Sequence, residues 1–506
     1  MKHLPAQRGL KPLVFALILL TTGCTGLPPY PVLQLPGPNA DTSGSNTSGT
    51  NASTANAPFR DVSWQQTPEQ QDESARRVAE LLAQPLSAER AVDVALINNP
   101  QLQMRLAELG IGLADLEQAR RLPNPGFSFL RTRTADGLDI ERGLHFNLAR
   151  LIFYPQLRSI EAKRFEQTRV LTLHEAASTA NRTRRAFYEA VAARQKLNYA
   201  LQVKDTADAA AELARRLEQA GNYNPLSRAR EQAFAVDAQQ ALTRARQQET
   251  STRIRLLRLL GLPSDITTLK LPDTLPALPD QLRDESDIRR AGLNQRLDVQ
   301  AAQQDALRTA DLLGLTKVSR FITLTELGFE RETGPAGEKK YGVDIGLTLP
   351  LFDSGDARVA RAQAAYQRSL MRVKATVLEA DGDLQLALDA WRTQWELAKR
   401  QRDNAVPLRR RITDETLLRY NGMIGSVFEL LAESRAQITS VSTYIDLLRD
   451  YWMADSDLSM ALLGRPVVGL AVGGLPHGAA GASPHGAGAA PEAAAPTASA
   501  PHAGGH

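Results

Sequence analysis

Six stretches with a helical pattern account for most of the chain, and two pairs of short alternating segments lie between them. The pattern predicts helices at about 87–121, 156–220, 226–260, 284–317, 355–420 and 424–463. The two longest are rich in alanine, which favours the helix and lets neighbouring helices approach closely. About 60 helical residues span roughly 90 Å, more than the diameter of a globular domain. We therefore expect an elongated bundle of long helices, with a kink at Pro407.

The alternating segments predict strands at about 125–135, 141–152, 319–331 and 341–352. A polar loop that contains glycine joins the two strands of each pair. Leu144, Phe146 and Leu148 share one face of the second strand, and Val343 and Ile345 share one face of the fourth. Strands of about ten residues with one apolar face are typical of outer-membrane barrels. Ordinary hairpins packed on the helical body are the alternative, and composition leaves both open.

The same order of elements occurs twice, and matched residues support an internal duplication. The offset between the copies rises steadily from 197 to 203 residues, whereas chance similarity would scatter. The matched pairs are Leu102 with Val299, Gly143 with Gly342, Gly221 with Gly422, and Gly261 with Gly464.

Four strands per chain are too few for a membrane barrel, which needs at least about eight. An open sheet edge in lipid would leave backbone N–H and C=O groups unsatisfied, at several kcal/mol each. If these strands enter the membrane, several copies must share one barrel. The predicted fold is thus mainly α with a small β part, each chain contributing four strands to an oligomeric barrel.

The N-terminus has the features of an export signal. Basic residues precede an apolar run at 13–20, small residues follow, and the only cysteine of the chain, Cys24, comes next. This arrangement resembles a bacterial lipobox, which implies that Cys24 is acylated and becomes the mature N-terminus. Thr25 in place of aspartate implies sorting to the outer membrane. The alternative is an ordinary signal peptide with an incidental cysteine.

Composition divides the remainder of the chain. We expect a signal peptide at 1–23, a lipid-anchored flexible segment at 24–63, two repeats at 64–283 and 284–466, and a disordered tail rich in glycine, alanine, proline and histidine at 467–506.

Charge and motifs exclude several classes of function. Lys and Arg number 60 against 56 Asp and Glu, so no large basic surplus exists to bind nucleic acid. A single cysteine excludes a disulfide framework and a thiolate zinc site. No phosphate-binding loop, dinucleotide-binding glycine motif or HExxH motif occurs. We therefore expect neither enzyme activity nor a cofactor.

The chain resembles the outer-membrane efflux proteins, the TolC-like channel tunnels, from about residue 64 to 465. The resemblance rests on the duplicated order of elements and on short stretches, which are Asn-Asn-Pro-Gln-Leu at 98–102, Leu-Pro-Asn-Pro at 122–125, the run at 346–355, Tyr-Asn-Gly at 420–422 and the Leu-Gly pairs that end each copy. It implies a homotrimer with a twelve-stranded transmembrane barrel and a periplasmic helical tunnel. It also implies a periplasmic adaptor (membrane fusion) protein and an inner-membrane pump of the resistance-nodulation-division type as partners, with outer-membrane lipid around the barrel.

By the same resemblance, the tips of the helical hairpins form the constriction and the docking surface. The tip residues are Gly221, Asn222, Tyr223, Tyr420, Asn421 and Gly422. Glycine and asparagine are also what tight turns require, so plain turn chemistry is an equally good interpretation.

Histidine is the only indication of cargo. Four of seven histidines lie in the tail: His477, His485, His502 and His506. Imidazole binds copper, zinc and nickel, but these residues are too widely spaced for a fixed site, so no metal site is assigned beyond possible recruitment by the tail. His145 and His174 are interpreted as isolated polar residues. We favour heavy-metal cations as cargo; drug efflux, type I protein secretion and a non-channel helical scaffold are the alternatives.

Overall fold

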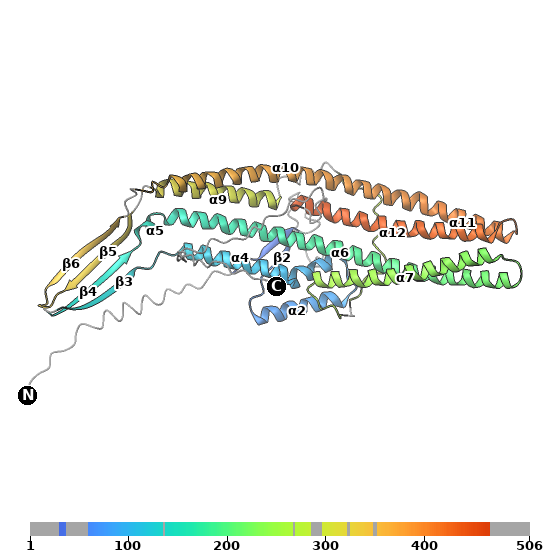
Figure 1. Cartoon of the computed structure of the whole chain (residues 1–506), viewed down its shortest axis with the longest axis horizontal. Coiled ribbons are helices and arrows are strands. Elements are labelled where there is room, and N and C mark those ends of the chain that lie inside the picture. Colours follow the sequence, from blue (N-terminus) through green and yellow to red (C-terminus); the bar gives the residue numbers. More distant parts are fainter. Residues whose placement is uncertain are drawn as a thin grey trace, which may run out of the picture. The chain divides into compact units, whose positions relative to one another are not determined.

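The computed structural model describes residues 30–36, 59–134, 137–266, 269–284, 296–320, 324–347 and 352–465. Within them, helices predominate and two small antiparallel sheets accompany them (Figure 1). The first half contains α2 (Pro68–Ala83), α3 (Ala88–Asn98), α4 (Pro100–Ala119), α5 (Leu148–Ile152), α6 (Tyr154–Gln219) and α7 (Pro225–Leu259). The second contains α9 (Leu297–Ser319), α10 (Asp356–Arg400), the π-helical turn η2 (Gln401–Ala405), α11 (Val406–Asn421) and α12 (Val427–Leu463).

The predicted long helices are confirmed, with α6 alone reaching 66 residues. The predicted continuous helix at 87–121 is wrong, because it divides into α3 and α4 at Asn99. A residue before proline avoids the α-helical region, and Asn99 accordingly has φ −72° and ψ 118°. Its side chain then caps α4 by accepting hydrogen bonds from the backbone N–H groups of Gln101 and Leu102, at 2.9 and 3.1 Å.

The same asparagine pair also holds the end of α7. Asn98 Nδ2 donates to the carbonyl oxygens of Leu260 and Gly261, both at 2.9 Å, and Asn99 Nδ2 donates to that of Leu259 at 2.8 Å. Gly261 has φ +69°, and a Cβ there would lie 2.1 Å from the backbone oxygen of Asn98. The Asn-Asn-Pro stretch at 98–100 and the Leu-Gly pair at 260–261 therefore contact each other directly.

The kink expected at Pro407 occurs as η2, between α10 and α11. Proline lacks a backbone N–H and its ring clashes with the carbonyl four residues earlier, here that of Asp403 inside η2. The helix accommodates this by widening for one turn, and the Val406 N–H bonds to the Gln401 oxygen five residues back.

Four strands form one sheet in the order β3-β4-β5-β6, with bounds Gly126–Thr134, Gly137–Phe146, Leu324–Thr333 and Lys339–Leu347. The central β4–β5 pair joins the hairpins of the two halves, with Ile140 opposite Thr333 and Phe146 opposite Leu327. The prediction that the second strand continues to residue 152 is wrong. Asn147 caps α5 by accepting a hydrogen bond from the Arg150 N–H at 2.8 Å, so the chain becomes helical there.

A second sheet near the N-terminus was not expected. β1 (Leu33–Pro36) pairs with β2 (Phe59–Val62), and Leu33, Leu35 and Val62 are buried in a core with residues of α3, α4 and α6. The prediction of a flexible segment at 24–63 is therefore wrong for these two strands, because the alternating leucines of β1 and Val62 of β2 pack against a helical surface that covers them.

The main core lies where α3, α6, α7, α10 and α12 meet. Trp391, 1% exposed, is its largest fully buried side chain, and its Nε1–H donates to Asp455 Oδ1 at 3.0 Å. Residues 269–284 cross this core as an extended segment that buries four leucines. The core thus joins both halves of the duplication.

Candidate functional site

The four-stranded sheet has two edge strands, β3 and β6, whose outer sides pair with no other strand among the described residues. An unpaired edge exposes a row of backbone N–H and C=O groups, which is a template for pairing with another chain. Both edges of the sheet are therefore available for pairing with another chain.

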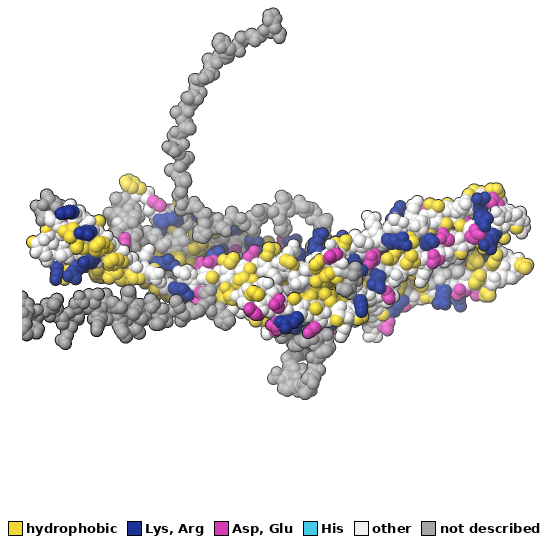
Figure 2. All heavy atoms as spheres, turned by 90° about the horizontal axis from the view of Figure 1, so that it is seen from below, with side chains coloured by type: hydrophobic (Ala, Val, Ile, Leu, Met, Phe, Trp, Pro, Cys, Tyr) yellow, Lys and Arg dark blue, Asp and Glu magenta, His cyan; other side chains and the backbone are white. Residues whose placement is uncertain are grey.

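One face of this sheet is apolar and exposed in the single chain. Antiparallel partners lie on the same face, and the row Phe127–Leu144–Phe329–Val343 runs across all four strands. These side chains are between 46% and 68% exposed. The predicted sharing of one face by Leu144 and Phe146, and by Val343 and Ile345, matches this register. In Figure 2, hydrophobic side chains cover part of the sheet, and dark-blue basic side chains gather beyond them at its outer end.

The other face carries every carboxylate of β3 to β6. The registers place on it Asp139, Glu141, Glu326, Glu330, Glu332 and Asp344. Lys340 and His145 are its basic residues, and Lys340 Nζ lies 3.4 Å from Glu332 Oε1. This segregation was not predicted, although acidic and apolar residues alternate in the sequence of β5.

The interpretation of His145 as an isolated residue is wrong. Its Nε2 lies 2.8 Å from Ser128 Oγ on β3, and its Nδ1 lies 3.4 Å from Glu326 Oε1 on β5. Gly328 is its direct partner on β5, and this glycine leaves room for the imidazole, because a Cβ there would lie 3.0 Å from Nδ1. Within the described ranges, no group of three potential ligands could hold a metal ion.

The first hairpin tip joins α6 to α7 through a Schellman turn. Gly221 has φ +78°, and the N–H of Asn222 bonds to the Leu217 oxygen at 2.9 Å. Asn224 then caps α7, accepting from the Ser227 N–H at 2.8 Å. No atom lies within 4 Å of a Cβ built at Gly221, so the glycine serves the backbone conformation alone.

The second tip, between α11 and α12, has the same turn shifted by one residue. Met423 takes the left-handed position with φ +58°, and the Ile424 N–H bonds to the Arg419 oxygen at 2.9 Å. Gly422 has φ −77° and ends α11. The pairing of Gly221 with Gly422 is therefore wrong in structural terms: Met423 is the equivalent residue, because hydrogen bonding rather than residue type defines the position. Met423 and Ile424 are 95% and 78% exposed, and sequence analysis missed this apolar pair as a surface feature.

The two tips are held against each other. The rings of Tyr223 and Phe428 stack with centroids 4.9 Å apart and an angle of 11° between their planes. Below them, the buried carboxylate of Glu231 accepts a hydrogen bond from Arg435 at 2.7 Å. Burial and the nearby Glu231 raise the pKa of Tyr223. Tyr223 is only 9% exposed and packs inward, whereas the side chains of Asn222, Tyr420 and Asn421 face solvent.

Two predicted site features lie outside the described residues: the lipidation site Cys24, and the tail histidines His477, His485, His502 and His506. Among the described helices, none combines the length and the hydropathy that a membrane crossing requires.

Known proteins support one family. No family model matches the chain. It is 26% identical over 326 residues to the pyoverdine export outer membrane protein OpmQ of Pseudomonas putida, covering 59% of this chain and 67% of the relative. It is 25% identical over 326 residues to the cobalt-zinc-cadmium resistance protein CzcC of Cupriavidus metallidurans, covering 60% and 74%.

Among solved structures, the fold matches the CmeC outer membrane channel of Campylobacter jejuni. The TM-score is 0.63 at 17% identity, covering 83% of this chain and 94% of that one. By name, these similar proteins are an export outer membrane protein, a metal resistance protein and an outer membrane channel. The duplicated long helices, the four-stranded sheet with two free edges and the paired hairpin tips agree with these similarities. The chain is therefore similar in sequence to outer-membrane export and metal-resistance proteins and shares the fold of an outer membrane channel, in agreement with the resemblance to the TolC-like family.

Proposed function

We propose that this chain is the outer-membrane channel subunit of a tripartite efflux system, a passive conduit without enzyme activity. One observation carries the proposal: the sheet β3-β4-β5-β6 has two unpaired edges and an exposed apolar face. In lipid each unpaired backbone group costs several kcal/mol, so the sheet is stable there only if further copies close it. Three chains with four strands each give the twelve-stranded barrel that the family resemblance implies, and α6, α7 and α10 to α12 then form the periplasmic tunnel.

Two neighbouring residues on opposite faces of β6 test this placement. Val343 lies on the apolar face and Asp344 on the acidic face. Arginine on a lipid-facing strand position costs about 2–4 kcal/mol at the middle of the bilayer, whereas substitutions toward the lumen are tolerated. We expect Val343→Arg to reduce the heat-modifiable trimer in the outer-membrane fraction and Asp344→Asn to leave it at the wild-type amount. Equal amounts of trimer for both variants, or a monomer that shows no conductance in planar bilayers, would contradict the proposal.

For the cargo we propose heavy-metal cations. The acidic face would line the channel, where its six carboxylates against Lys340 and His145 favour cations over anions. The name of the CzcC relative points the same way, whereas that of OpmQ points to export of an organic molecule. The second candidate is therefore drug-type efflux, with type I protein secretion and a non-channel scaffold as the remaining alternatives. A deletion strain should become sensitive to zinc, cobalt, cadmium or copper; sensitivity to drugs alone would refute the metal assignment.

For partners we propose a periplasmic adaptor and an inner-membrane pump of the resistance-nodulation-division type, which dock at the hairpin tips. The predicted tip residues Gly221, Asn222, Tyr420, Asn421 and Gly422 are exposed. Tyr223 would support the tip from within through its stack on Phe428.

The double variant Asn222→Ala with Asn421→Ala should retain the trimer but lose most of the cross-linking to the adaptor. Met371→Ala in α10, where the side chain is 60% exposed, is the matched control and should cross-link as the wild type does. Undiminished cross-linking of the tip variant would mean that these residues serve only the turns.

We also propose that Cys24 is acylated and anchors the mature chain to the outer membrane, and that the tail histidines recruit metal. Cys24→Ala should abolish fatty-acid labelling and cause mis-sorting; unchanged labelling would refute the anchor. Deleting residues 467–506 should lower metal tolerance without reducing the trimer, and an unchanged tolerance would remove the tail from the mechanism.

A further inference from the structure

Basic residues gather at one end of the apolar face of the sheet. The row Phe127–Leu144–Phe329–Val343 is followed by the row Phe129–Arg142–Arg331–Tyr341. Two residues of a strand advance about 7 Å, so the surface changes from apolar to basic within that distance. The next row toward the hairpin turns adds two further cations, Arg131 and Lys339.

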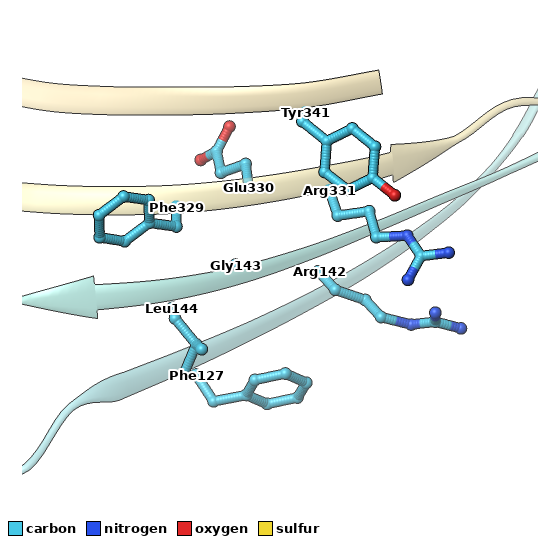
Figure 3. Close-up of a pocket in the computed structure, with 8 residues that line it drawn as sticks. All are labelled: Phe127, Arg142, Gly143, Leu144, Phe329, Glu330, Arg331 and Tyr341. Carbon is cyan, nitrogen blue, oxygen red and sulfur yellow. The ribbon is translucent and has the colours of Figure 1, made fainter. Parts of the chain in front are cut away.

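Arg142 and Arg331 form an unusual pair. They lie directly opposite each other on β4 and β5, where like charges destabilise a sheet. Figure 3 shows their side chains side by side, extending in the same direction beside Tyr341. The guanidinium of Arg331 lies 5.7 Å from the centre of the Tyr341 ring, which gives it a cation–π contact on one side.

No carboxylate on this face neutralises the pair. All six acidic residues of the described strands β3 to β6 lie on the opposite face. The Nε of Arg331 is buried and has no hydrogen-bond partner among the described residues. The two guanidinium groups therefore form a cationic site with unused donors, bordered by apolar and aromatic side chains.

We propose that this row binds the phosphate groups of a phosphorylated membrane lipid in the leaflet that the hairpin turns reach. The inference rests on the proposed function, because a lipid meets this face only when the sheet is inserted in a membrane. Guanidinium binds phosphate through two parallel hydrogen bonds, which relieves the repulsion between Arg142 and Arg331.

The neighbouring rows distinguish a lipid from a free anion. Phe129 and Tyr341 lie in the same row as the arginines, where aromatic rings are placed at the level of lipid headgroups. The fully apolar row about 7 Å away offers contact to acyl chains. A free phosphate would use the guanidinium groups alone, whereas a lipid uses both rows.

The test uses the purified full-length trimer in detergent, with a bis-phosphorylated lipid A as the probe. Dephosphorylated lipid A and inorganic phosphate are the comparison ligands, and the measured quantities are the dissociation constant and the shift in thermal midpoint. We expect Arg142→Gln with Arg331→Gln to weaken lipid binding at least about tenfold, because each charge-assisted hydrogen bond contributes that much. Lys340→Gln is the matched control, one residue from Tyr341 on the opposite face, and it should bind as the wild type does.

Each alternative outcome is decisive. Equal binding by the double variant and the wild type overturns the proposal, as does equal binding of the dephosphorylated lipid. Stabilisation by inorganic phosphate as strong as by the lipid would replace the lipid with a free anion. Arg142→Lys with Arg331→Lys keeps the charge but loses the paired donors, so its affinity for the lipid should lie between those of the wild type and the double glutamine variant. Because it keeps both charges, it also provides a test of the site if the glutamine variant misfolds. Conductance in planar bilayers is measured in parallel, so that the two proposals fail separately. If the double glutamine variant conducts and binds the lipid as the wild type does, the lipid site is refuted and the channel is not. If the wild type does not conduct, the proposed channel function is refuted.

Discussion

Replacing Arg296 by methionine tests how the second half of the bundle is held together. The Arg296 side chain is 1% exposed and precedes α9. Its Nη1 donates to the carbonyl oxygens of Ala380 in α10 and Ala461 in α12, at 3.1 and 3.0 Å, and its Nη2 lies 2.6 Å from Asp298 Oδ2. One guanidinium thus joins α9, α10 and α12. The matched position in the first half is Asn99, whose amide bonds the end of α7 in the same way.

Methionine keeps the length of the side chain but removes the guanidinium hydrogen bonds to two carbonyl oxygens and to Asp298, whose Oδ1 keeps its hydrogen bond from the Val299 N–H at 2.9 Å. It also removes the cation nearest to Asp383, at 3.6 Å. Burial raises the pKa of Asp383 and Arg296 opposes that rise, so the variant makes the charged form of Asp383 still less favourable. Breaking a buried ion network by removing one partner costs about 3–5 kcal/mol. We expect the free energy of unfolding to fall by that amount.

The measurement is urea unfolding of the trimer, monitored by far-ultraviolet circular dichroism. All variants are compared at the same protein concentration, because the stability of an oligomer depends on concentration. The matched control is Arg105→Met. Arg105 pairs with Glu108 one helical turn away, and both side chains are 55% exposed, so the loss should stay below about 0.5 kcal/mol. If Arg296→Met loses no more than Arg105→Met, the three-helix junction does not carry the stability assigned to it.

Three further predictions follow from the packing. Glu89→Gln should cost about 2 kcal/mol at neutral pH, because the carboxylate accepts two hydrogen bonds from Arg184 at 3.0 and 3.1 Å. Gly221→Ala should destabilise the first tip by about 1 kcal/mol and Met423→Gly should stabilise the second by a similar amount, because both positions are left-handed. Trp391→Ala should cost about 3–5 kcal/mol, since it empties a fully buried site in the main core.

The Glu89 prediction also has a definite pH dependence. Burial tends to raise the pKa of Glu89, but its hydrogen bonds and ion pairs with Arg184 and Arg60 outweigh burial and lower it below 4.5. A lowered folded-state pKa means that the stabilisation is present above pH 4.5 and disappears as the pH falls through the folded value. The difference between wild type and Glu89→Gln should therefore shrink in acid, and a difference that grew there would contradict the assignment. The other variants are measured by thermal unfolding. A change in stability of the same sign for Gly221→Ala and Met423→Gly would refute the assignment of both positions to the left-handed conformation. A loss of stability below about 1 kcal/mol for Trp391→Ala would refute its role in the main core.

Periodicity alone predicted the long helices and the four strands, because these depend on neighbours within a few residues. It failed where local backbone chemistry overrode the pattern. Pro100, which keeps the preceding Asn99 out of the α-helical conformation, and the cap at Asn147 ended elements that the apolar spacing would have continued. The widened turn at η2 had a local cause, Pro407, and was correspondingly predictable as a kink.

Contacts between distant segments were beyond any local pattern. His145 was interpreted as isolated because Ser128 and Glu326 come from other strands, one of them in the other half of the chain. Likewise, nothing in the neighbourhood of Arg296 in the sequence indicates that it bonds carbonyl groups of Ala380 and Ala461.

By itself, the sequence determined which residues of each strand share a face, since alternation is a property of the strand, and that four strands cannot close a barrel within one chain. Only the tertiary structure decided the register of β4 against β5. That register sets Arg142 opposite Arg331 and keeps every carboxylate of the sheet on the other face. The physical reason is that a two-residue period fixes the face of a side chain, whereas its neighbour across the sheet depends on where two segments nearly two hundred residues apart meet.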